Sequence, residues 1–221
     1  MTNQQKSILA LPVNVLRRCP DSTVQGLMDI VNTGYHKQVV KYNIVQTPRI
    51  HELGTFFSDL GLDIDDCLMY LMVDDVAGVS SEIDQDDCIS VSQYKLYNIS
   101  QPLPLLFTQE NVKSTLAYRP LPQEKYPNSY EMTGFTSSGK GCGLETFNNT
   151  LAHFKQRYNQ CEKLVIKVII EHELVTYYER KMGFVELSRA LQKRCDLQSS
   201  GFEDSFMVTQ DFNVASMEKV L

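Results

Sequence analysis

Hydrophobic residues recur along this chain with two different periods, which predict an alternation of strands and helices. Alternating or continuous apolar runs predict strands at 13–20, 67–73, 88–99, 129–137, 163–170, 184–188 and 205–212. Spacings of three and four predict helices over 21–35, 49–61, 142–154 and 172–182. Prolines interrupt residues 100–128, where a short strand at 114–120 is a further option. The pattern predicts an α/β fold of about seven strands and about four helices.

The composition narrows the class of protein. With 221 residues, 43% of them hydrophobic, the chain can bury one sizeable core, and we expect a single domain over residues 1–221. A net charge of −6 leaves no general basic surface, so we expect no nucleic-acid partner. Six cysteines stand far apart with no histidine at metal-ligand spacing, which predicts reduced thiols and no metal site.

No apolar run in the sequence is long enough for a secretory signal or a membrane span. We therefore expect no membrane partner and place the protein in the cytoplasm, with the nucleus as the alternative.

The segment GFTSSGKGCGLETF, residues 134–147, places glycines at 139, 141 and 143 between a predicted strand and a predicted helix. Glycines allow backbone conformations closed to other residues, so successive N–H groups can converge on an anion at the positive end of a helix dipole. The segment therefore indicates a phosphate-binding loop. The alternative is a turn that packs the helix closely on its strand, and these residues alone favour neither.

Two nucleotide-binding motifs fail on this segment. Gly134, Gly139 and Lys140 match the P-loop pattern, but Gly141 follows where that motif requires a Ser or Thr to hold magnesium. The dinucleotide fingerprint also fails, because Thr146 stands where its third glycine is required. A nucleotide hydrolase is therefore the least favoured hypothesis.

The sequence SGKGCG resembles the acyl-CoA pyrophosphate loop of the GCN5-related N-acetyltransferases, in which Gln or Arg, two residues, Gly, one residue and Gly or Ala join a strand to a helix. Ser138, Gly141 and Gly143 fill the three defined positions, and Ser138 departs from the pattern because it lacks the usual long side chain. The later segment KLVIKVIIEHELVTYYERKMGFVEL resembles the next block of that family. Its Gly183 comes one residue late, which predicts a bulged helix end.

The resemblance covers most of the chain in the order of its elements, and its specific motifs lie within residues 129–187. It implies the fold of that family, in which helices flank a mixed, mostly antiparallel central sheet. The first half, including 49–61, resembles a branch of fungal acetyltransferases of unassigned substrate.

The resemblance also implies a site for acetyl-CoA as co-substrate. The residues implied in binding it are Phe135, Thr136, Ser138, Gly139, Lys140, Gly141, Cys142, Gly143 and Glu171. Backbone N–H groups of the loop would hold the pyrophosphate, and the strand would pair along the pantetheine arm. Lys140 either attracts a phosphate or is merely solvated. Cys142 packs beneath the donor in this fold, so we do not expect a nucleophilic cysteine.

Acyl transfer to an amine requires an acceptor for the amine's proton. Glu131 is the candidate general base, because it lies a few residues before the loop, as the base of that family often does. Strand alternation predicts that it shares a face with Thr133 and Phe135. The alternative is a glutamate that merely faces solvent.

The leaving thiolate requires a hydrogen-bond or proton donor. Tyr178 is the candidate acid, since a phenol with a pKa of about 10 matches a thiolate of comparable basicity. Tyr177 is the alternative if the late Gly183 exchanges the two roles. His172 is either a second acid–base group or a cap or surface residue.

These features predict an N-acetyltransferase that moves an acetyl group from acetyl-CoA to a primary amine by direct attack in a ternary complex. The alternative is a catalytically inactive protein of the same fold that binds CoA, which Ser138 and the displaced Gly183 favour. The sequence does not specify the amine acceptor, and we expect a monomer or a homodimer.

Overall fold

Nine strands form one mixed sheet. The computed structural model describes residues 6–74, 88–197 and 206–221. The strands are β1 (Lys6–Pro12), β2 (Leu68–Asp74), β3 (Cys88–Val91), β4 (Tyr94–Asn98), β5 (Val112–Pro120), β6 (Ser129–Ser137), β7 (Lys163–Ile169), β8 (Val185–Gln192) and β9 (Phe212–Val220). Their order in the sheet is β3-β4-β1-β2-β5-β6-β7-β9-β8. Only the β1–β4 and β6–β7 pairs are parallel among the described strands, which confirms the mixed, mostly antiparallel sheet.

The number of strands differs from the prediction of about seven because of two local features. The apolar run 88–99 is a hairpin of two strands, turning at Ser92, whose φ of 54° is left-handed. The optional strand at 114–120 is present, and it extends as β5 over Val112–Pro120.

The described helices are α1 (Val13–Leu16), α2 (Asp21–Tyr42), α3 (Phe56–Asp59), α5 (Cys142–Arg157) and α6 (Val175–Tyr177), with shorter turns η1 (Leu53–Thr55), η3 (Ile170–His172), η4 (Tyr178–Met182) and η5 (Arg194–Asp196). The strand predicted at 13–20 is wrong, because β1 ends at Pro12 and Val13–Leu16 turn into the core as a short helix. The helix predicted at 49–61 is also wrong in extent. In place of one continuous helix, this segment contains the short elements η1 and α3. The Asp59 carboxylate holds the segment together by accepting hydrogen bonds from the His51 amide and the Thr55 hydroxyl.

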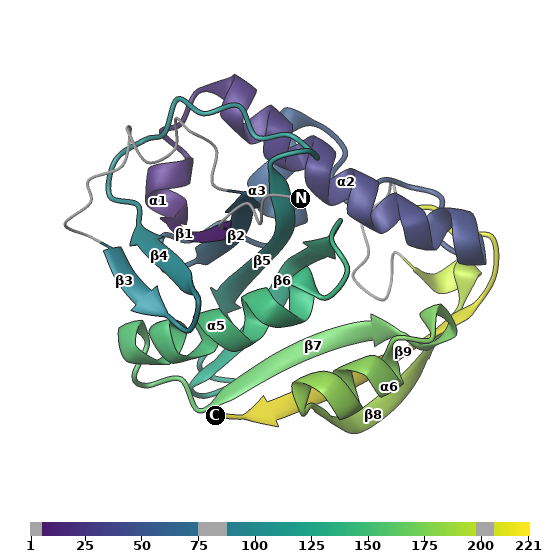
Figure 1. The fold of residues 1–221 in the computed structure, drawn as a ribbon. Helices are drawn as coiled ribbons and strands as arrows, with labels where there is room; N and C mark the ends of the chain where they lie inside the picture. Colours follow the sequence, from purple (N-terminus) through teal and green to yellow (C-terminus); the bar gives the residue numbers. More distant parts are fainter. Residues whose placement is uncertain (1–5, 75–87, 198–205) are drawn as a thin grey trace.

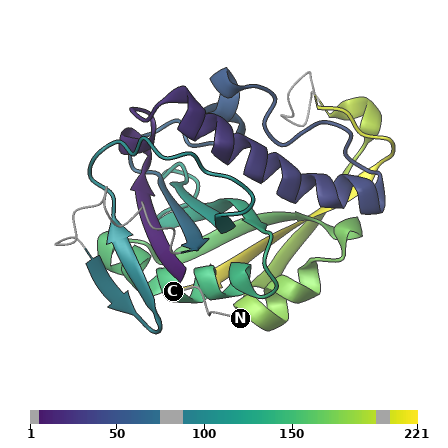
Figure 2. The same ribbon diagram turned by 45° about the horizontal axis from the view of Figure 1, so that its top comes forward.

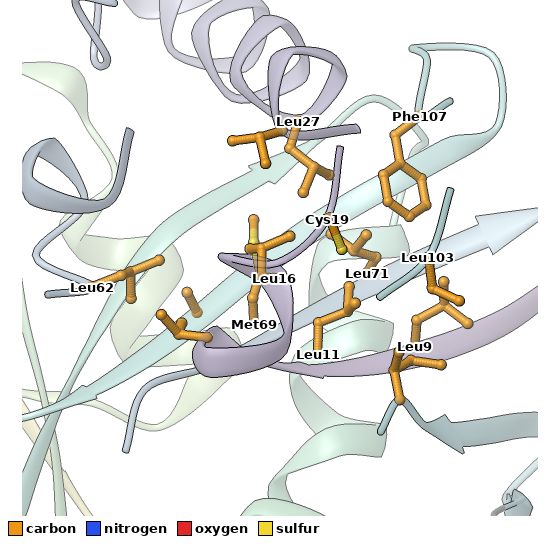
Figure 3. Close-up of a cluster of buried hydrophobic side chains, with 14 of the residues drawn as sticks. Leu9, Leu11, Leu16, Cys19, Leu27, Leu62, Met69, Leu71, Leu103 and Phe107 are labelled. Atoms are coloured by element: carbon orange, nitrogen blue, oxygen red, sulfur yellow. The ribbon is translucent and has the colours of Figure 1, made fainter. Parts of the chain in front are cut away.

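Two hydrophobic cores lie on opposite faces of the sheet. The first joins α1, α2 and α3 to the sheet, and Figure 3 shows Leu16 and Leu27 from these helices against Leu9 and Leu71 of β1 and β2. The second joins α5 and α6 to the other face through residues such as Leu116. Strands β1, β2 and β5 therefore each contribute residues to both cores.

β6 changes the direction of its side chains at a bulge. Its register against β5 shifts between Thr115 and Ala117, next to Gly134, whose φ is +57°. Beyond the bulge Thr136 faces α2, where its Cβ would lie 2.5 Å from a Cβ built on Gly34. Phe135 faces α5 and belongs with the second core.

β6 and β7 part soon after they begin. Three residue pairs join them, ending at Glu131 and Val165, and Figure 1 shows the two strands diverging toward their ends. α2 extends along the molecule on the first-core side of the sheet, as the turned view in Figure 2 shows. No described helix is long and apolar enough to cross a membrane.

Candidate functional site

The glycine-containing loop joins the end of β6 to the start of α5, as predicted. Gly141 is the residue before the helix, with a left-handed φ of +83°, a conformation that L side chains rarely adopt. A Cβ on Gly141 would meet no atom within 4 Å, so its surroundings are open. This position therefore requires glycine for its backbone conformation, and a ligand has room to approach it.

The start of α5 presents amide groups that have no acceptor. In the described part of the chain, the amides of Lys140, Gly141, Gly143 and Leu144 donate no hydrogen bond, while Cys142 N–H donates to the Gly139 carbonyl at 3.2 Å. No side chain caps the helix. The first amides of a helix carry the positive end of its dipole, so this end is suited to an anionic group such as a phosphate.

Two neighbouring positions of the loop serve packing. A Cβ on Gly143 would lie 3.0 Å from the Phe135 ring, so this glycine lets α5 approach β6 closely. Ser138 donates from its hydroxyl to the carbonyls of Val112 and Lys113 at 3.2 and 3.3 Å, which ties the loop to β5. Ser138 and Gly143 therefore have the contacts that the packing interpretation predicts, while phosphate binding by the loop stays a prediction.

Lysines from distant parts of the chain surround this loop. Lys37 of α2 donates to the Ser137 carbonyl at 3.1 Å. Lys6 donates to Cys142 Sγ at 3.3 Å, and Cys142 is buried beneath the loop, in agreement with a packing role. Lys140 is exposed. The surroundings of the loop are therefore cationic although the whole chain is acidic.

Tyr178 lies beside the parted strands. Its ring centroid is 6.3 Å from that of Phe135 on β6 and 6.0 Å from that of Phe184. Burial raises its pKa far above the ordinary value, and the neighbouring Tyr35 of α2 raises it further. The phenol therefore keeps its proton at neutral pH and is a hydrogen-bond donor.

The late glycine is explained by a bulged helix end. The turn η4 is a π-helix over Tyr178–Met182, and Gly183 ends it with a φ of +74°. A π turn contains one more residue than an α turn would. The predicted bulge is thus confirmed. Tyr177 stacks edge-on against Tyr178 at 5.6 Å.

The prediction that Glu131 shares a face with Thr133 and Phe135 is confirmed for Thr133 and wrong for Phe135. It remains on the face of Thr133, but the bulge at Gly134 turns Phe135 to the opposite face. The carboxylate accepts hydrogen bonds from Nε and Nη2 of Arg119 at 2.9 and 2.5 Å, and its side chain is 15% exposed. Both hydrogen bonds are accepted by Oε2, so this oxygen is engaged by Arg119.

His172 is neither a cap nor a surface residue. It lies in η3 at the end of β7, and its ring stacks on Tyr42 of α2 at 5.2 Å. Its Nε2 is buried without a hydrogen-bond partner among the described residues, as is Oε1 of Gln38, one helical turn before Tyr42. Burial lowers the pKa of His172, so the imidazole is neutral at pH 7.

Glu171 is engaged by β9. Its carboxylate accepts hydrogen bonds from the backbone amide and side-chain amide of Asn213, at 2.9 Å for each to Oε1. Thr136 is buried, with its hydroxyl 3.0 Å from that of Thr115. Only the backbone of Thr136 is therefore placed to meet a ligand between the strands.

Sequence reasoning missed the residues that α2 contributes. The apolar spacing predicts a helix that ends near Tyr35, but α2 continues to Tyr42. Its last two turns carry Lys37 and Gln38 to the site. Their signal in the sequence is weak, because this stretch is polar and lacks apolar periodicity.

Comparisons with known proteins agree with this architecture. A family model described as sporulation protein RMD6 matches residues 1–221. The sporulation protein RMD6 of Saccharomyces cerevisiae is 35% identical over 228 residues, which cover 97% of this chain and 95% of that protein.

Solved structures share the fold at low identity. A ribosomal-protein-alanine N-acetyltransferase from Brucella melitensis is 13% identical with a TM-score of 0.53, covering 92% of this chain and 97% of that one. The spermidine/spermine N-acetyltransferase SpeG from Vibrio cholerae is also 13% identical, with a TM-score of 0.51 over 99% of this chain and 95% of that one. The chain therefore has the fold of the GCN5-related N-acetyltransferases and belongs to the sporulation protein RMD6 family.

Proposed function

We propose that this protein transfers an acetyl group from acetyl-CoA to a primary amine. The observation that carries the proposal is the parting of β6 and β7 beside a helix start whose amides have no acceptor. A strand edge without a partner can pair with an extended amide-bearing chain, and free helix amides suit a pyrophosphate. Acetyl-CoA carries both groups.

The chain supplies matching groups for each part of this donor. The amides of Lys140, Gly141, Gly143 and Leu144 would hold the pyrophosphate, with Lys37 and Lys140 adding positive charge. The backbone of Phe135 and Thr136 would pair with the pantetheine arm. The side chains of Ser138 and Glu171 form hydrogen bonds within the protein. These residues would therefore support acetyl-CoA binding indirectly, by holding the loop and the end of β7 in place.

The buried acceptor atoms near α2 favour an amine as the second substrate. Gln38 Oε1 and His172 Nε2 lack donors within the described residues, and an unsatisfied buried polar atom costs about 1–3 kcal/mol. An amine supplies N–H donors. The solved proteins of this fold named above are called N-acetyltransferases of ribosomal-protein alanine and of spermidine/spermine, and N-acetylation takes place on an amine nitrogen.

The chemistry follows from these groups. The amine nitrogen attacks the thioester carbon, and the carbon–sulfur bond breaks as the carbon–nitrogen bond forms. His172, neutral because burial lowers its pKa, accepts the amine's proton directly or through water. The Tyr178 phenol donates to the departing sulfur. Glu131 contributes by holding Arg119 in an ion pair beside β6, on the side of the sheet where the amine would bind.

A second candidate is a protein that binds CoA without catalysis. The ion pair between Glu131 and Arg119 favours this alternative, because it occupies the carboxylate expected to act as base. Donor binding alone does not distinguish the two functions, so binding and turnover must be measured separately.

Donor binding is tested by thermal unfolding and calorimetry. Acetyl-CoA should raise the Tm, since a ligand that binds the native state stabilises it by mass action, whereas ATP with magnesium and NAD should not. Gly141→Val should weaken acetyl-CoA binding at least tenfold, because the side chain would occupy the open approach to the loop. Gly54→Val is the matched control, since a Cβ there meets only the Glu52 carboxylate at 3.8 Å.

Turnover is tested by the release of CoA thiol with a panel of amines that includes spermidine and a peptide with a free amino-terminal alanine. Thiol release that depends on an amine supports the transferase. Acetyl-CoA binding without thiol release on any amine selects the non-catalytic alternative, and stabilisation by ATP instead of acetyl-CoA overturns both.

A further inference from the structure

A cavity lies far from the glycine loop. It has a volume of about 630 Å³ and is enclosed by the ends of β1 and β4, by α1, and by the last turns of α5. Ligand pockets in proteins commonly have volumes of about 300–1,000 Å³. Some 15 residues of α5 separate Cys142 from Arg157, which corresponds to about 22 Å. This cavity is therefore distinct from the proposed acetyl-CoA site.

A hydrogen-bonded chain fixes one polar group of its wall. Tyr70 is fully buried, and its hydroxyl lies 2.7 Å from Nδ1 of His153. The other ring nitrogen, Nε2, lies 2.8 Å from Oδ1 of Asn98. Burial raises the pKa of Tyr70 and lowers that of His153, so both groups are neutral at pH 7.

With Oδ1 of Asn98 as the atom beside Nε2, the neutral groups have one consistent arrangement of protons. The Tyr70 hydroxyl donates to Nδ1, and Nε2–H of His153 then donates to Oδ1 of Asn98. Because Oδ1 accepts this bond, the Nδ2 amide of Asn98 is the end left for the cavity. Two N–H donors are thereby presented at the end of β4, held in place by a buried network.

The charged groups of the cavity wall are all positive. Arg18, two residues after the end of α1, and Arg157 of α5 line it, and no described acidic side chain does. Neither arginine forms an ion pair within the described residues: Arg18 Nε donates to the Asn14 carbonyl, and Arg157 lies over the Tyr158 ring at 5.9 Å. Two arginines without a carboxylate partner among the described residues thus lie beside one cavity, in a chain with a net charge of −6.

The remaining walls are mixed: Ala10, Val15 and Ile99 are apolar, and Asn14, Ser100 and Gln156 are polar. Guanidinium groups and an amide N–H pair are suited to planar or tetrahedral oxyanions, which they can bind through several hydrogen bonds. We infer that this cavity binds a small organic anion, with its carboxylate or phosphate group on Arg18, Arg157 and Asn98 and a compact apolar body against Ala10 and Ile99.

The inference is tested with three probes that share one apolar body: benzoate, phenyl phosphate and the neutral benzamide. The readout is the side-chain ¹H–¹³C spectrum of the four histidines, in which His153→Gln assigns the His153 signal. Benzoate or phenyl phosphate should shift that signal in a saturable way through the millimolar range, and the tighter of the two identifies the anionic group. Benzamide should bind at least tenfold more weakly.

Variants assign the effect to this cavity. Arg157→Gln and Asn98→Asp should each weaken the anion at least tenfold. Asn98→Asp keeps the acceptor for His153 Nε2–H but replaces the amide donors with a negative oxygen. Lys155→Gln removes the same charge from an exposed position of the same helix and should leave the affinity unchanged.

Three outcomes would overturn the inference. Benzamide could bind as tightly as benzoate, Arg157→Gln and Asn98→Asp could both retain wild-type affinity, or neither anion could move the His153 signal. A Gly141→Val protein should still bind the anion, which separates this cavity from the proposed acetyl-CoA site.

Discussion

Tyr178 and Tyr177 are adjacent in sequence but have different surroundings. The Tyr178 ring contacts Phe135 of β6, and the nearby Tyr35 of α2 raises the pKa of Tyr178. The ring contact described for Tyr177 is with Tyr178 itself. The structure thus favours Tyr178 as the group that meets a leaving thiolate, and its role in catalysis remains a prediction.

Substituting each tyrosine tests this assignment. Tyr178→Phe removes one oxygen at nearly constant volume, so folding and acetyl-CoA affinity should change little while kcat falls about 10²- to 10⁴-fold, as expected for loss of a general acid. Tyr177→Phe should reduce kcat less than about tenfold. Steady-state kinetics at saturating acetyl-CoA measure both, and equal rates in wild type and both variants would exclude a catalytic tyrosine here.

Two buried histidines should make stability depend on pH. Burial lowers the pKa of His153 and of His172 below the value of about 6.5 expected in the unfolded chain. The unfolded state therefore binds more protons in this range, so their stabilising contribution is complete above about pH 6.5 and is lost as the pH falls through the folded pKa values.

The measurement is the Tm between pH 7.5 and pH 5 at constant ionic strength. The wild-type Tm should fall on acidification, and the double variant His153→Gln/His172→Gln should fall less steeply. His36→Gln, at an exposed position, serves as the control. A wild-type slope that survives the double substitution would assign the pH dependence to other groups.

α2 approaches the site closely because glycine occupies position 34, where it faces β6. A Cβ on Gly34 would lie 2.5 Å from Cβ of Thr136, so glycine sets the distance between the helix and β6. The turns that follow carry Tyr35, Lys37 and Gln38. The spacing of an entire helix, and hence the position of the proposed acceptor groups, depends on this contact.

Gly34→Ala separates helix propensity from packing. Alanine is favoured over glycine in a helix by about 1 kcal/mol, but overpacking at a contact this close costs about 1–3 kcal/mol. We expect net destabilisation in urea unfolding and weaker acetyl-CoA binding. Gly54→Ala, which meets only Glu52 at 3.8 Å, should be close to neutral. Stabilisation by Gly34→Ala would show that α2 is not seated by this contact.

Elements with strong local signals could be predicted from the sequence. β6 has the predicted bounds, β7 ends one residue earlier than predicted, and α5 begins at Cys142, because apolar alternation and the glycine loop define them locally. The segment 13–20 could not be assigned in this way, since Val13, Val15 and Leu16 are buried in a helix of one turn with no helical period to detect. The final strand was placed at 205–212 but begins at Phe212, because its pairing with β7 decides its register.

The site could be predicted only where it is contiguous in sequence. The loop and Tyr178 come from two segments with recognisable spacing. The bulge at Gly134, the ion pair between Arg119 and Glu131, and the stacking of His172 on Tyr42 depend on contacts between distant segments, which no local pattern encodes.

At the level of the whole molecule, the sheet separates two faces with different features. The glycine loop and α5 lie with the second core, while α2 and its polar residues lie with the first. A substrate bound between β6 and β7 would meet both faces, because this is where the sheet is not closed by backbone pairing. The proposed donor and acceptor groups can thus approach one point from opposite sides.

The parting of β6 and β7 also has a consequence for deuterium exchange. Backbone amides in a paired strand exchange slowly, and those without a partner exchange fast. In the free protein, the amides of 132–137 that point away from β5 should exchange faster than the corresponding amides of 129–131, where β6 still pairs with β7. Acetyl-CoA should slow exchange in 132–137 and leave 129–131 unchanged, and in Gly141→Val this protection should be lost. Bound acetyl-CoA would then pair with β6 in the place of a tenth strand, so the gap in the sheet would be filled only while the donor is bound.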